Sequence, residues 1–215
     1  MENETSNAVA GIDELRMRKT VFEFLSAVYL TEMTRDFLDE LRCEPIALDG
    51  ELARFVDLLQ DADLDVVRSD LAAEYARLFL GMSSSPVAPY ESVYASDLHI
   101  LMQEPRDEVL GEYRSEGLVV TADLRLPEDH LSFELAFMAH MCQRTIEARQ
   151  IGDYDEADRC LVKQRTFLEA HLLNWVPALC ADVRARARTS FYRGIADLTE
   201  RCLDFDRVCL SDSAA

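Results

Sequence analysis

The chain has 215 residues, and its 41 acidic and 22 basic side chains give a formal net charge of −19 at pH 7. Nucleic acids and anionic membranes are bound by lysine and arginine side chains that neutralise phosphates, so this charge argues against both as partners. Hydrophobic residues form 49% of the chain, which is enough to bury a core, and seven glycines and six prolines are few for this length. Long helices are therefore favoured over a many-stranded sheet.

The N-terminus does not resemble an export signal. Its first ten residues, MENETSNAVA, are polar and acidic and lack the basic start and apolar run of such a signal, and no stretch is long and apolar enough to span a membrane. We expect a cytoplasmic protein with no stable membrane insertion. The six cysteines form no C-x-x-C pair, so we interpret them as reduced and mostly buried, and we expect no cofactor.

Apolar side chains recur at helical spacing through the first 80 residues. The first apolar stripe consists of Leu15, Phe22, Leu25 and Tyr29. Thr34 can cap the second helix. Gly81 ends the fourth, because glycine readily adopts the left-handed backbone conformation that often follows a helix. After a disordered N-terminus at residues 1–10, the helices are expected at about 12–30, 34–41, 50–59 and 64–80.

Two irregular stretches interrupt the helices. Residues 81–90, GMSSSPVAPY, contain three serines and two prolines, which cannot continue a helix and favour extended backbone. One or two helices then reach Tyr113, and a second irregular stretch follows before residue 127. The net charge also differs between the two parts of the chain. Residues 1–125 hold 26 acids and 11 bases, whereas residues 126–215 hold 15 acids and 11 bases.

The remaining sequence predicts further long helices. Pro127 opens the first, because proline suits the first helical turn, and Glu128 and Asp129 follow where carboxylates oppose the positive end of the helix dipole. Later helices are expected at about 154–174, with Pro177 bending or splitting them, and at about 189–208. The sequence therefore predicts an all-α fold of about eight or more helices, with an N-terminal subdomain at 11–115, a hinge at 116–126 and a C-terminal subdomain at 127–210.

No catalytic motif stands out. The chain has no G-x-S-x-G elbow, no phosphate-binding glycine loop and no pair of histidines at the i, i+4 spacing of a helical zinc site. The dipeptide Asp129-His130 leaves one enzymatic alternative open, a helical metal-dependent phosphohydrolase, although such enzymes carry histidine before aspartate. A helical adaptor without a peptide groove is a further alternative.

Aromatic, proline and acidic side chains gather at two junctions between helices. Aromatic rings beside prolines form a rigid apolar groove for the side chains of a peptide, and carboxylates nearby pair bidentately with arginine. In the opposing interpretation, Tyr75, Leu78 and Phe79 belong to the core, and Glu128 and Asp129 only stabilise a helix start. The candidate peptide-binding residues are Tyr75, Leu78, Phe79, Pro86, Pro89, Tyr90, Glu91, Tyr94, Pro127, Glu128, Asp129 and His130.

Three segments, in this order, resemble the TorD/DmsD family of cytoplasmic chaperones for exported molybdoenzymes. Residues 74–81 (EYARLFLG) with residues 86–94 (PVAPYESVY) look like the family's Leu-Phe-x-Gly helix end and its proline-aromatic loop. Residues 126–131 (LPEDHL) resemble its Glu-Pro-x-Asp-His signature, with Leu126 in place of the leading glutamate. Residues 167–177 (FLEAHLLNWVP) are similar to its Phe-Leu-x-x-His-Leu-x-x-Trp-x-Pro stretch.

The resemblance implies a chaperone and not an enzyme. Such a chaperone binds the twin-arginine signal peptide of a molybdopterin-cofactor oxidoreductase subunit and holds it, with the body of that subunit, until the cofactor is inserted and the subunit is exported. A monomer or a domain-swapped dimer is expected. An arginine pair beside an apolar run would complement the groove and the carboxylates of Glu91, Glu128 and Asp129, while His130 would tie the two halves together by hydrogen bonding.

Overall fold

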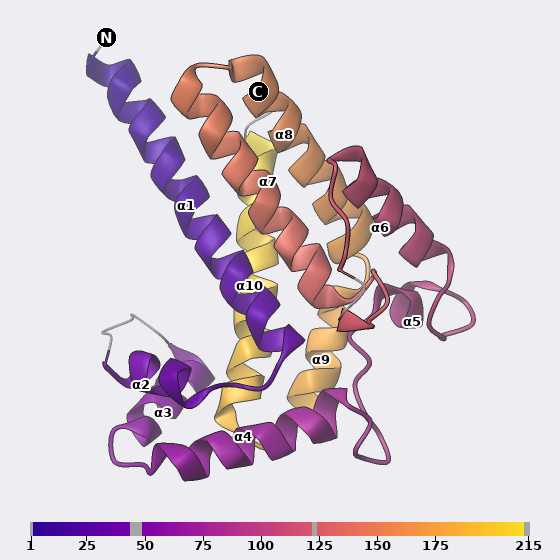
Figure 1. The fold of residues 1–215 in the computed structure, drawn as a ribbon. Coiled ribbons are helices and arrows are strands. Elements are labelled where there is room, and N and C mark those ends of the chain that lie inside the picture. Colours follow the sequence, from indigo (N-terminus) through magenta and orange to yellow (C-terminus); the bar gives the residue numbers. More distant parts are fainter. Residues whose placement is uncertain (1, 44–48, 122–123, 213–215) are drawn as a thin grey trace.

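The computed structural model describes residues 2–43, 49–121 and 124–212, with side chains from residue 11 to residue 211 in these ranges. In this part of the chain the fold is all-α, as predicted, and no strand is formed (Figure 1). The elements are α1 (Glu2–Leu30), α2 (Arg35–Cys43), α3 (Gly50–Leu59), α4 (Leu64–Phe79), α5 (Glu91–Ala95), α6 (Glu104–Ser115), α7 (Leu131–Ile151), α8 (Tyr154–Phe167), the π-helical turn η2 (Leu168–Leu172), α9 (Val176–Arg186) and α10 (Ser190–Asp212).

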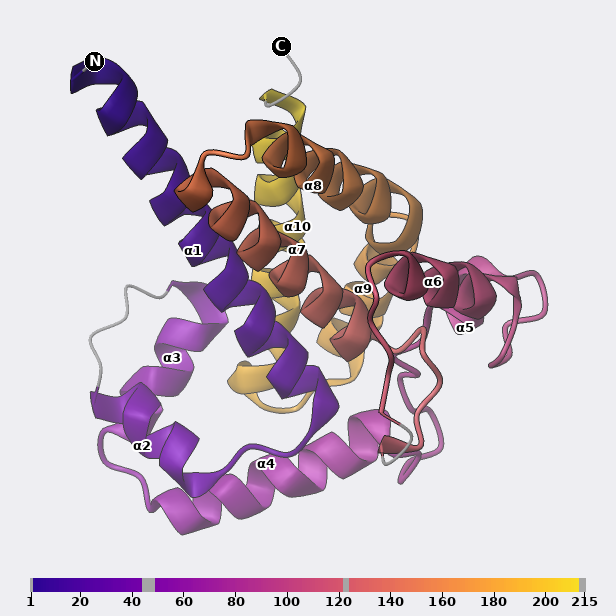
Figure 2. The ribbon, with the colours of Figure 1, turned by 45° about the horizontal axis from the view of Figure 1, so that its top comes forward.

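Four long helices form the centre of the molecule. Helix α1 packs along α7, α7 packs along α8, and α10 lies behind them, in contact with both α1 and α8 (Figures 1 and 2). Helices α2, α3 and α4 gather at one end, where α3 packs on α10, and α5 and α6 lie at the flank beside α9. Helices from both predicted subdomains thus pack together, while the division at 116–126 stays a prediction.

The predicted apolar stripes form the core. Leu15, Phe22, Leu25 and Tyr29 on α1 are at most 2% exposed, and the stripe on α7, which includes Leu131 and Leu135, is fully buried. Burying large apolar side chains stabilises the fold by about 1.5–3 kcal/mol each. This burial is the main reason why the long helices assemble.

A buried ion pair and its hydrogen-bond partners join the four central helices. The Arg18 guanidinium on α1 lies 2.5 and 2.7 Å from the two carboxylate oxygens of Asp206 on α10, and it also donates to Gln164 Oε1 on α8 at 2.6 Å. Gln164 in turn donates to Thr145 Oγ1 on α7 at 2.8 Å. Because every partner is buried, the network fixes how α1, α7, α8 and α10 sit against one another.

Helix ends follow the expected chemistry in the first half of the chain. Thr34 Oγ1 accepts a hydrogen bond from the Phe37 amide at 3.1 Å, so the predicted cap of α2 is confirmed. Gly81 follows α4 with φ of 74°, a conformation that favours glycine. The predicted break at Glu44 and Pro45 lies outside the described residues.

Three helix boundaries differ from the predictions. Helix α1 begins at Glu2, so its backbone includes the segment that the sequence assigned to a disordered N-terminus. Helix α7 begins at Leu131 and not at Pro127, because residues 127–130 form a turn and the side chain of His130 caps the helix by accepting from the Ser132 amide. The helix predicted at 154–174 changes to a π-helical turn after Phe167.

Candidate functional site

The two irregular segments that carry most candidate residues lie side by side. The Glu91 amide donates to the Asp129 carbonyl at 3.0 Å, and the Leu131 amide donates to the Pro89 carbonyl at 2.9 Å. Tyr90 and His130 thereby form an isolated antiparallel bridge. Residues 86–94 and 127–130, far apart in sequence, therefore meet at one junction.

The Asp129 side chain is buried and holds the start of α5. It is 0% exposed, and its Oδ2 accepts from the Ser92 amide at 2.8 Å, while its Oδ1 has no hydrogen-bond partner among the described residues. The Ser92 hydroxyl accepts from the amide of Gln103, the residue before α6, at 3.2 Å. Asp129 consequently positions both α5 and the beginning of α6.

Glu91 is likewise buried, at 1% exposure. Its Oε2 accepts from His171 Nδ1 and its Oε1 accepts from Asn174 Nδ2, each at 3.1 Å. The π-helical turn, in which the Leu173 amide donates to the Leu168 carbonyl, places both donors against this carboxylate. Glu91 therefore fastens α5 to the turn between α8 and α9.

A third buried carboxylate, Glu134 on α7, was missed by the sequence reasoning. It is 0% exposed and accepts from Trp175 Nε1 at 3.2 Å, while its other oxygen lacks a partner within the described structure. Burial raises its pKa well above the usual value, and the nearby carboxylates of Glu91 and Asp129 act in the same direction. An acid inside the apolar run Leu-Ser-Phe-Glu-Leu-Ala-Phe was the available signal.

His130 is buried and neutral at pH 7. Its Nδ1 lies 2.7 Å from Ser132 Oγ, its ring meets the Tyr90 ring edge to face at 4.9 Å, and burial lowers its pKa to about 4. Its side-chain hydrogen bonds are thus local to the start of α7. Backbone hydrogen bonds and Asp129 join the two segments instead.

Glu128 and Pro127 are partly exposed at the edge of the junction. The Glu128 carboxylate accepts from Arg106 Nε on α6 at 2.5 Å, and this hydrogen bond lowers the pKa of Glu128. The acid is therefore ionised and already paired with a cation of the same chain.

The aromatic candidates divide between core and surface. Tyr75 and Leu78 are buried, and the Tyr75 hydroxyl donates to the Tyr29 carbonyl at 3.0 Å. Phe79 is partly buried, with its ring 5.8 Å from the Tyr29 ring. These three side chains pack as the opposing interpretation of the sequence expects, and their part in peptide binding stays a prediction.

The other aromatic and proline candidates surround the junction. Tyr94 is partly exposed, donates to Asp182 Oδ2 at 3.0 Å and lies beside the Trp175 ring. Tyr90 is also partly exposed, Pro86 is exposed and Pro89 is buried. Tyr90, Tyr94 and Pro86 are thus the candidates from residues 86–94 that a peptide can reach directly.

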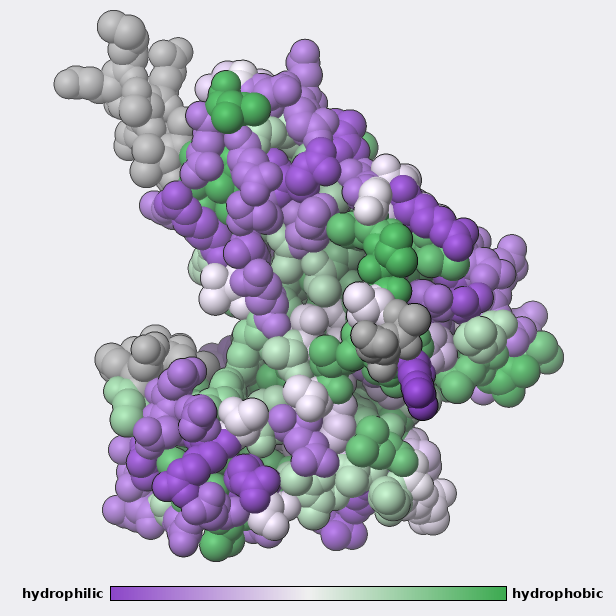
Figure 3. Space-filling view, in the orientation of Figure 1, coloured by the Kyte–Doolittle hydropathy of each residue, from purple (hydrophilic) through white to green (hydrophobic). Residues whose placement is uncertain are grey.

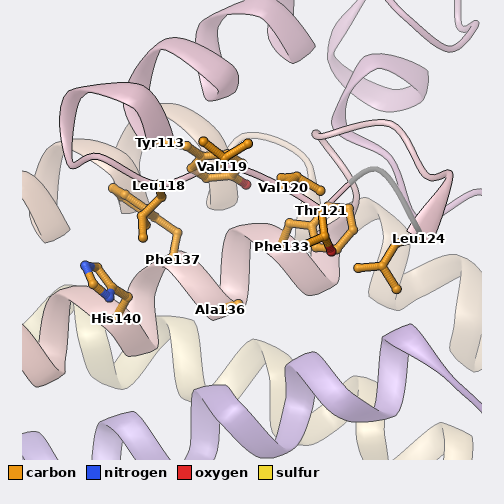
Figure 4. A pocket seen from close by; sticks show the side chains of 10 residues that line it. All are labelled: Tyr113, Leu118, Val119, Val120, Thr121, Leu124, Phe133, Ala136, Phe137 and His140. Carbon is orange, nitrogen blue, oxygen red and sulfur yellow. The ribbon is translucent and has the colours of Figure 1, made fainter.

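An apolar pocket of about 280 Å³ lies over α7, next to this junction (Figure 4). Tyr113, residues 118–121 and Leu124 cover it on one side, and Phe133 and Phe137 form the other side, with His140 at one end. Burial is the main cause that lowers the pKa of His140. A pocket of this chemistry can accept an apolar side chain of a ligand.

Residues 2–43, 49–121 and 124–212 contain no candidate metal site. In these ranges no group of three or more histidine, cysteine, aspartate or glutamate side chains is placed to hold an ion. None of the helices in these ranges is long and apolar enough to cross a membrane.

Comparison with known proteins gives concordant results. Residues 46–181 match the protein family described as nitrate reductase delta subunit. A protein of Vibrio cholerae serotype O1 (strain M66-2) named Chaperone protein TorD is 30% identical over 213 residues, which cover 91% of this chain and 92% of that protein. Proteins of the same name from Vibrio parahaemolyticus and Shewanella pealeana are 28% and 27% identical and cover 84% and 86% of this chain.

Proposed function

The chain belongs to the nitrate reductase delta subunit family, which includes the TorD chaperones, and on that premise we propose that it is a cytoplasmic chaperone for the maturation of a molybdoenzyme. It binds the twin-arginine signal peptide of the catalytic subunit, contacts the body of that subunit, and holds both until the molybdopterin cofactor is inserted and export can begin. It acts as a monomer or a domain-swapped dimer and carries no cofactor of its own.

The observation that carries this proposal is the similarity to TorD chaperones along nearly the whole length of both chains. A match confined to one motif could reflect a shared helix end, whereas a match over 91% of the chain includes the core, the loops and the junction. Fold alone does not give function, so the junction must also suit the proposed ligand.

Surface chemistry at the junction supports peptide binding. Tyr90, Tyr94 and Pro86 offer apolar surface, and the apolar pocket over α7 lies next to them. A signal peptide presents an apolar run after its arginine pair, and exposed aromatic rings suit such a run. The net charge of −19 attracts the cationic end of the peptide over a distance.

The enzymatic alternative has no support in the geometry of Asp129 and His130. The Asp129 carboxylate accepts a hydrogen bond from the Ser92 amide, and the His130 ring is hydrogen-bonded to the Ser132 hydroxyl. Neither side chain belongs to a group of metal-binding side chains in the part of the chain that the structure describes. The curated relatives named above are chaperones and not hydrolases.

Titration of the purified protein with a twin-arginine leader peptide tests the proposal, with fluorescence anisotropy as the readout. We expect a Kd of about 1 μM or lower, equivalent to roughly −8 kcal/mol, and weaker binding at high salt. A peptide in which both arginines are alanine serves as the matched control. Equal binding of the two peptides, or binding of neither, would contradict the proposal.

Two substitutions test the junction itself. Tyr90→Ala removes exposed apolar surface and Asp129→Asn weakens the anchor of α5, so both should weaken leader binding while the helical circular dichroism signal persists. Leu58→Ala, an exposed apolar position on α3 away from the junction, is the control. Unchanged affinity in both junction variants would place the peptide elsewhere.

A further inference from the structure

The loop between α5 and α6 exposes a row of apolar side chains. Leu98, Ile100, Leu101 and Met102 are 66%, 53%, 41% and 56% exposed. Hydrophobic atoms gather at the right edge of the molecule in Figure 3, where Figure 1 draws this loop. Contiguous exposed apolar side chains are costly in water and mark surfaces that bind a partner.

Hydrogen bonds give this loop a defined shape. The His99 amide donates to the Ser96 carbonyl at 3.2 Å, and His99 Nδ1 lies 2.9 Å from the Val93 carbonyl oxygen. Where the loop joins α6, the Gln103 amide donates to Ser92, which Asp129 holds in turn. A loop that is already ordered loses less conformational entropy when a partner binds.

An acidic cavity of about 390 Å³ lies directly beside the apolar row. Glu91 is one of its lining residues, and the Glu91 carboxylate already accepts hydrogen bonds from His171 and Asn174. The remaining acids that line it are Asp97, Glu104 and Glu108.

Within the described ranges, no cation pairs with these three acids. Asp97, Glu104 and Glu108 are exposed, and their side chains form no ion pair and no hydrogen bond with any residue that the structure describes. The neighbouring cation, Arg106, is bound by Glu128 and Asp107. The α5–α6 surface, defined as Leu98, Ile100, Leu101 and Met102 with Asp97, Glu104 and Glu108, thus combines free carboxylates with apolar side chains.

We infer that the arginine pair of the leader binds in this acidic cavity, that the apolar residues nearest to the pair lie on the loop at Leu98, Ile100, Leu101 and Met102, and that the rest of the run lies on the junction. The inference rests on the proposed function and assigns the two parts of the leader to places in the fold. Guanidinium groups pair with carboxylates, and the carboxylates of the junction are buried or already paired, whereas Asp97, Glu104 and Glu108 are exposed and have no partner among the described residues.

Other occupants fit the surface less well. Nucleic acid and anionic lipid are repelled by the carboxylates. A divalent cation requires converging oxygen ligands, and no such group exists in the described ranges. A cationic segment followed by apolar residues satisfies both halves of the surface.

The triple variant Asp97→Asn, Glu104→Gln and Glu108→Gln tests the electrostatic half. The Kd for the twin-arginine peptide should rise by about tenfold or more, because charge-assisted hydrogen bonds are lost. The matched control is Asp57→Asn, Asp61→Asn and Asp70→Asn, which removes the same charge from exposed acids on and near α3 and α4. The control should change the Kd by less than about twofold.

Crossing these proteins with the two peptides gives the decisive comparison. Replacing both arginines with alanine should weaken binding to the wild type and to the control variant but should leave binding to the cavity variant unchanged. Equal weakening in all three proteins would overturn the inference, yet it would leave the proposed function standing. Failure of the wild type to bind the twin-arginine peptide would overturn the proposed function itself.

The apolar half is tested by Ile100→Ser with Met102→Ser. Both side chains are exposed, so the fold should keep its stability, and affinity for the full leader should fall by about fivefold or more. A short peptide with the arginine pair but no apolar run should bind the variant and the wild type equally. Unchanged affinity for the full leader would remove the loop from the binding surface.

Discussion

The centre of the bundle and the α5–α6 surface use acidic side chains in opposite ways. In the centre, the Asp206 carboxylate is fully buried and receives two hydrogen bonds from Arg18. On the α5–α6 surface, Asp97, Glu104 and Glu108 are exposed and form no ion pair within the described structure. The pairing within the bundle serves the fold, and the free carboxylates are available to a partner.

The difference also explains how one acidic chain can be both stable and receptive. A buried carboxylate without a cation is costly, so the bundle requires its arginine. Exposed carboxylates remain solvated, and their mutual repulsion is relieved when a cationic peptide arrives. Stability and binding should therefore respond to different substitutions.

The largest effect on stability is expected when the buried pair of Arg18 and Asp206 is broken. Arg18→Met leaves Asp206 buried without its cation, so the free energy of unfolding should fall by about 3–5 kcal/mol, measured by urea denaturation. Arg16→Met is the matched control, because Arg16 on the same helix pairs with Asp13 at the surface and should matter by less than about 1 kcal/mol. Equal losses in the two variants would show that the buried pair contributes no more to the free energy of unfolding than the surface pair does.

His130, in the junction of residues 86–94 and 127–130, should make stability depend on pH. Its pKa is about 4 in the folded protein, below the ordinary value of 6.5, so its contribution is present above pH 6.5 and is lost as the pH falls toward 4. The loss should be on the order of 3 kcal/mol.

His130→Asn isolates this contribution, because asparagine keeps a cap for α7 without titrating. The difference in melting temperature between wild type and variant should change between pH 7 and pH 4. A constant difference across this range would show that His130 is not responsible.

An intermediate effect is expected where α3 meets α10. A Cβ atom added at Gly194 would lie 2.6 Å from Leu52 Cγ and 2.7 Å from the Leu52 amide nitrogen. Gly194→Ala should therefore cost about 1–3 kcal/mol of stability. Gly111→Ala on α6, where a Cβ meets nothing within 4 Å, should instead stabilise by about 0.5–1 kcal/mol. The same sign in both variants would refute the close approach.

The smallest effect is expected from replacing Arg106, beside the α5–α6 surface. Arg106→Gln removes the cation of Glu128 and Asp107, both partly or fully exposed, so stability should change by less than about 1 kcal/mol. Leader affinity should rise by about twofold, because more carboxylate becomes free near the cavity. Arg42→Gln, which frees Asp39 on α2, should leave affinity unchanged. A fall in affinity would mean that Arg106 itself supports the site.

Periodicity and capping were sufficient for most of the helices. The range of α3 and the cap of α2 at Thr34 follow from local sequence, because both depend on residues within one or two turns. The all-α class and the family follow from composition and from the three ordered segments. These features are encoded locally or by similarity.

The failures involve partners that are distant in sequence. Asp129 was predicted in the first turn of α7, but the Ser92 amide, 37 positions away, holds its side chain outside the helix. Burial of Glu91 depends on His171 and Asn174, which a single sequence does not place. The α5–α6 surface was missed because its apolar residues lack helical spacing and their exposure is a property of the fold.

Crosslinking tests the central claim most directly. A twin-arginine leader peptide with a photoreactive group beside the arginine pair is bound to the wild-type protein, irradiated, and the crosslinked residues are identified by mass spectrometry. Crosslinks are predicted at residues 96–108, and they should be competed away by the unlabelled leader but not by its double-alanine form. Competed crosslinks confined to α2, α3 and α4, or crosslinks that the double-alanine peptide competes equally well, would contradict the claim that this surface recognises the arginine pair.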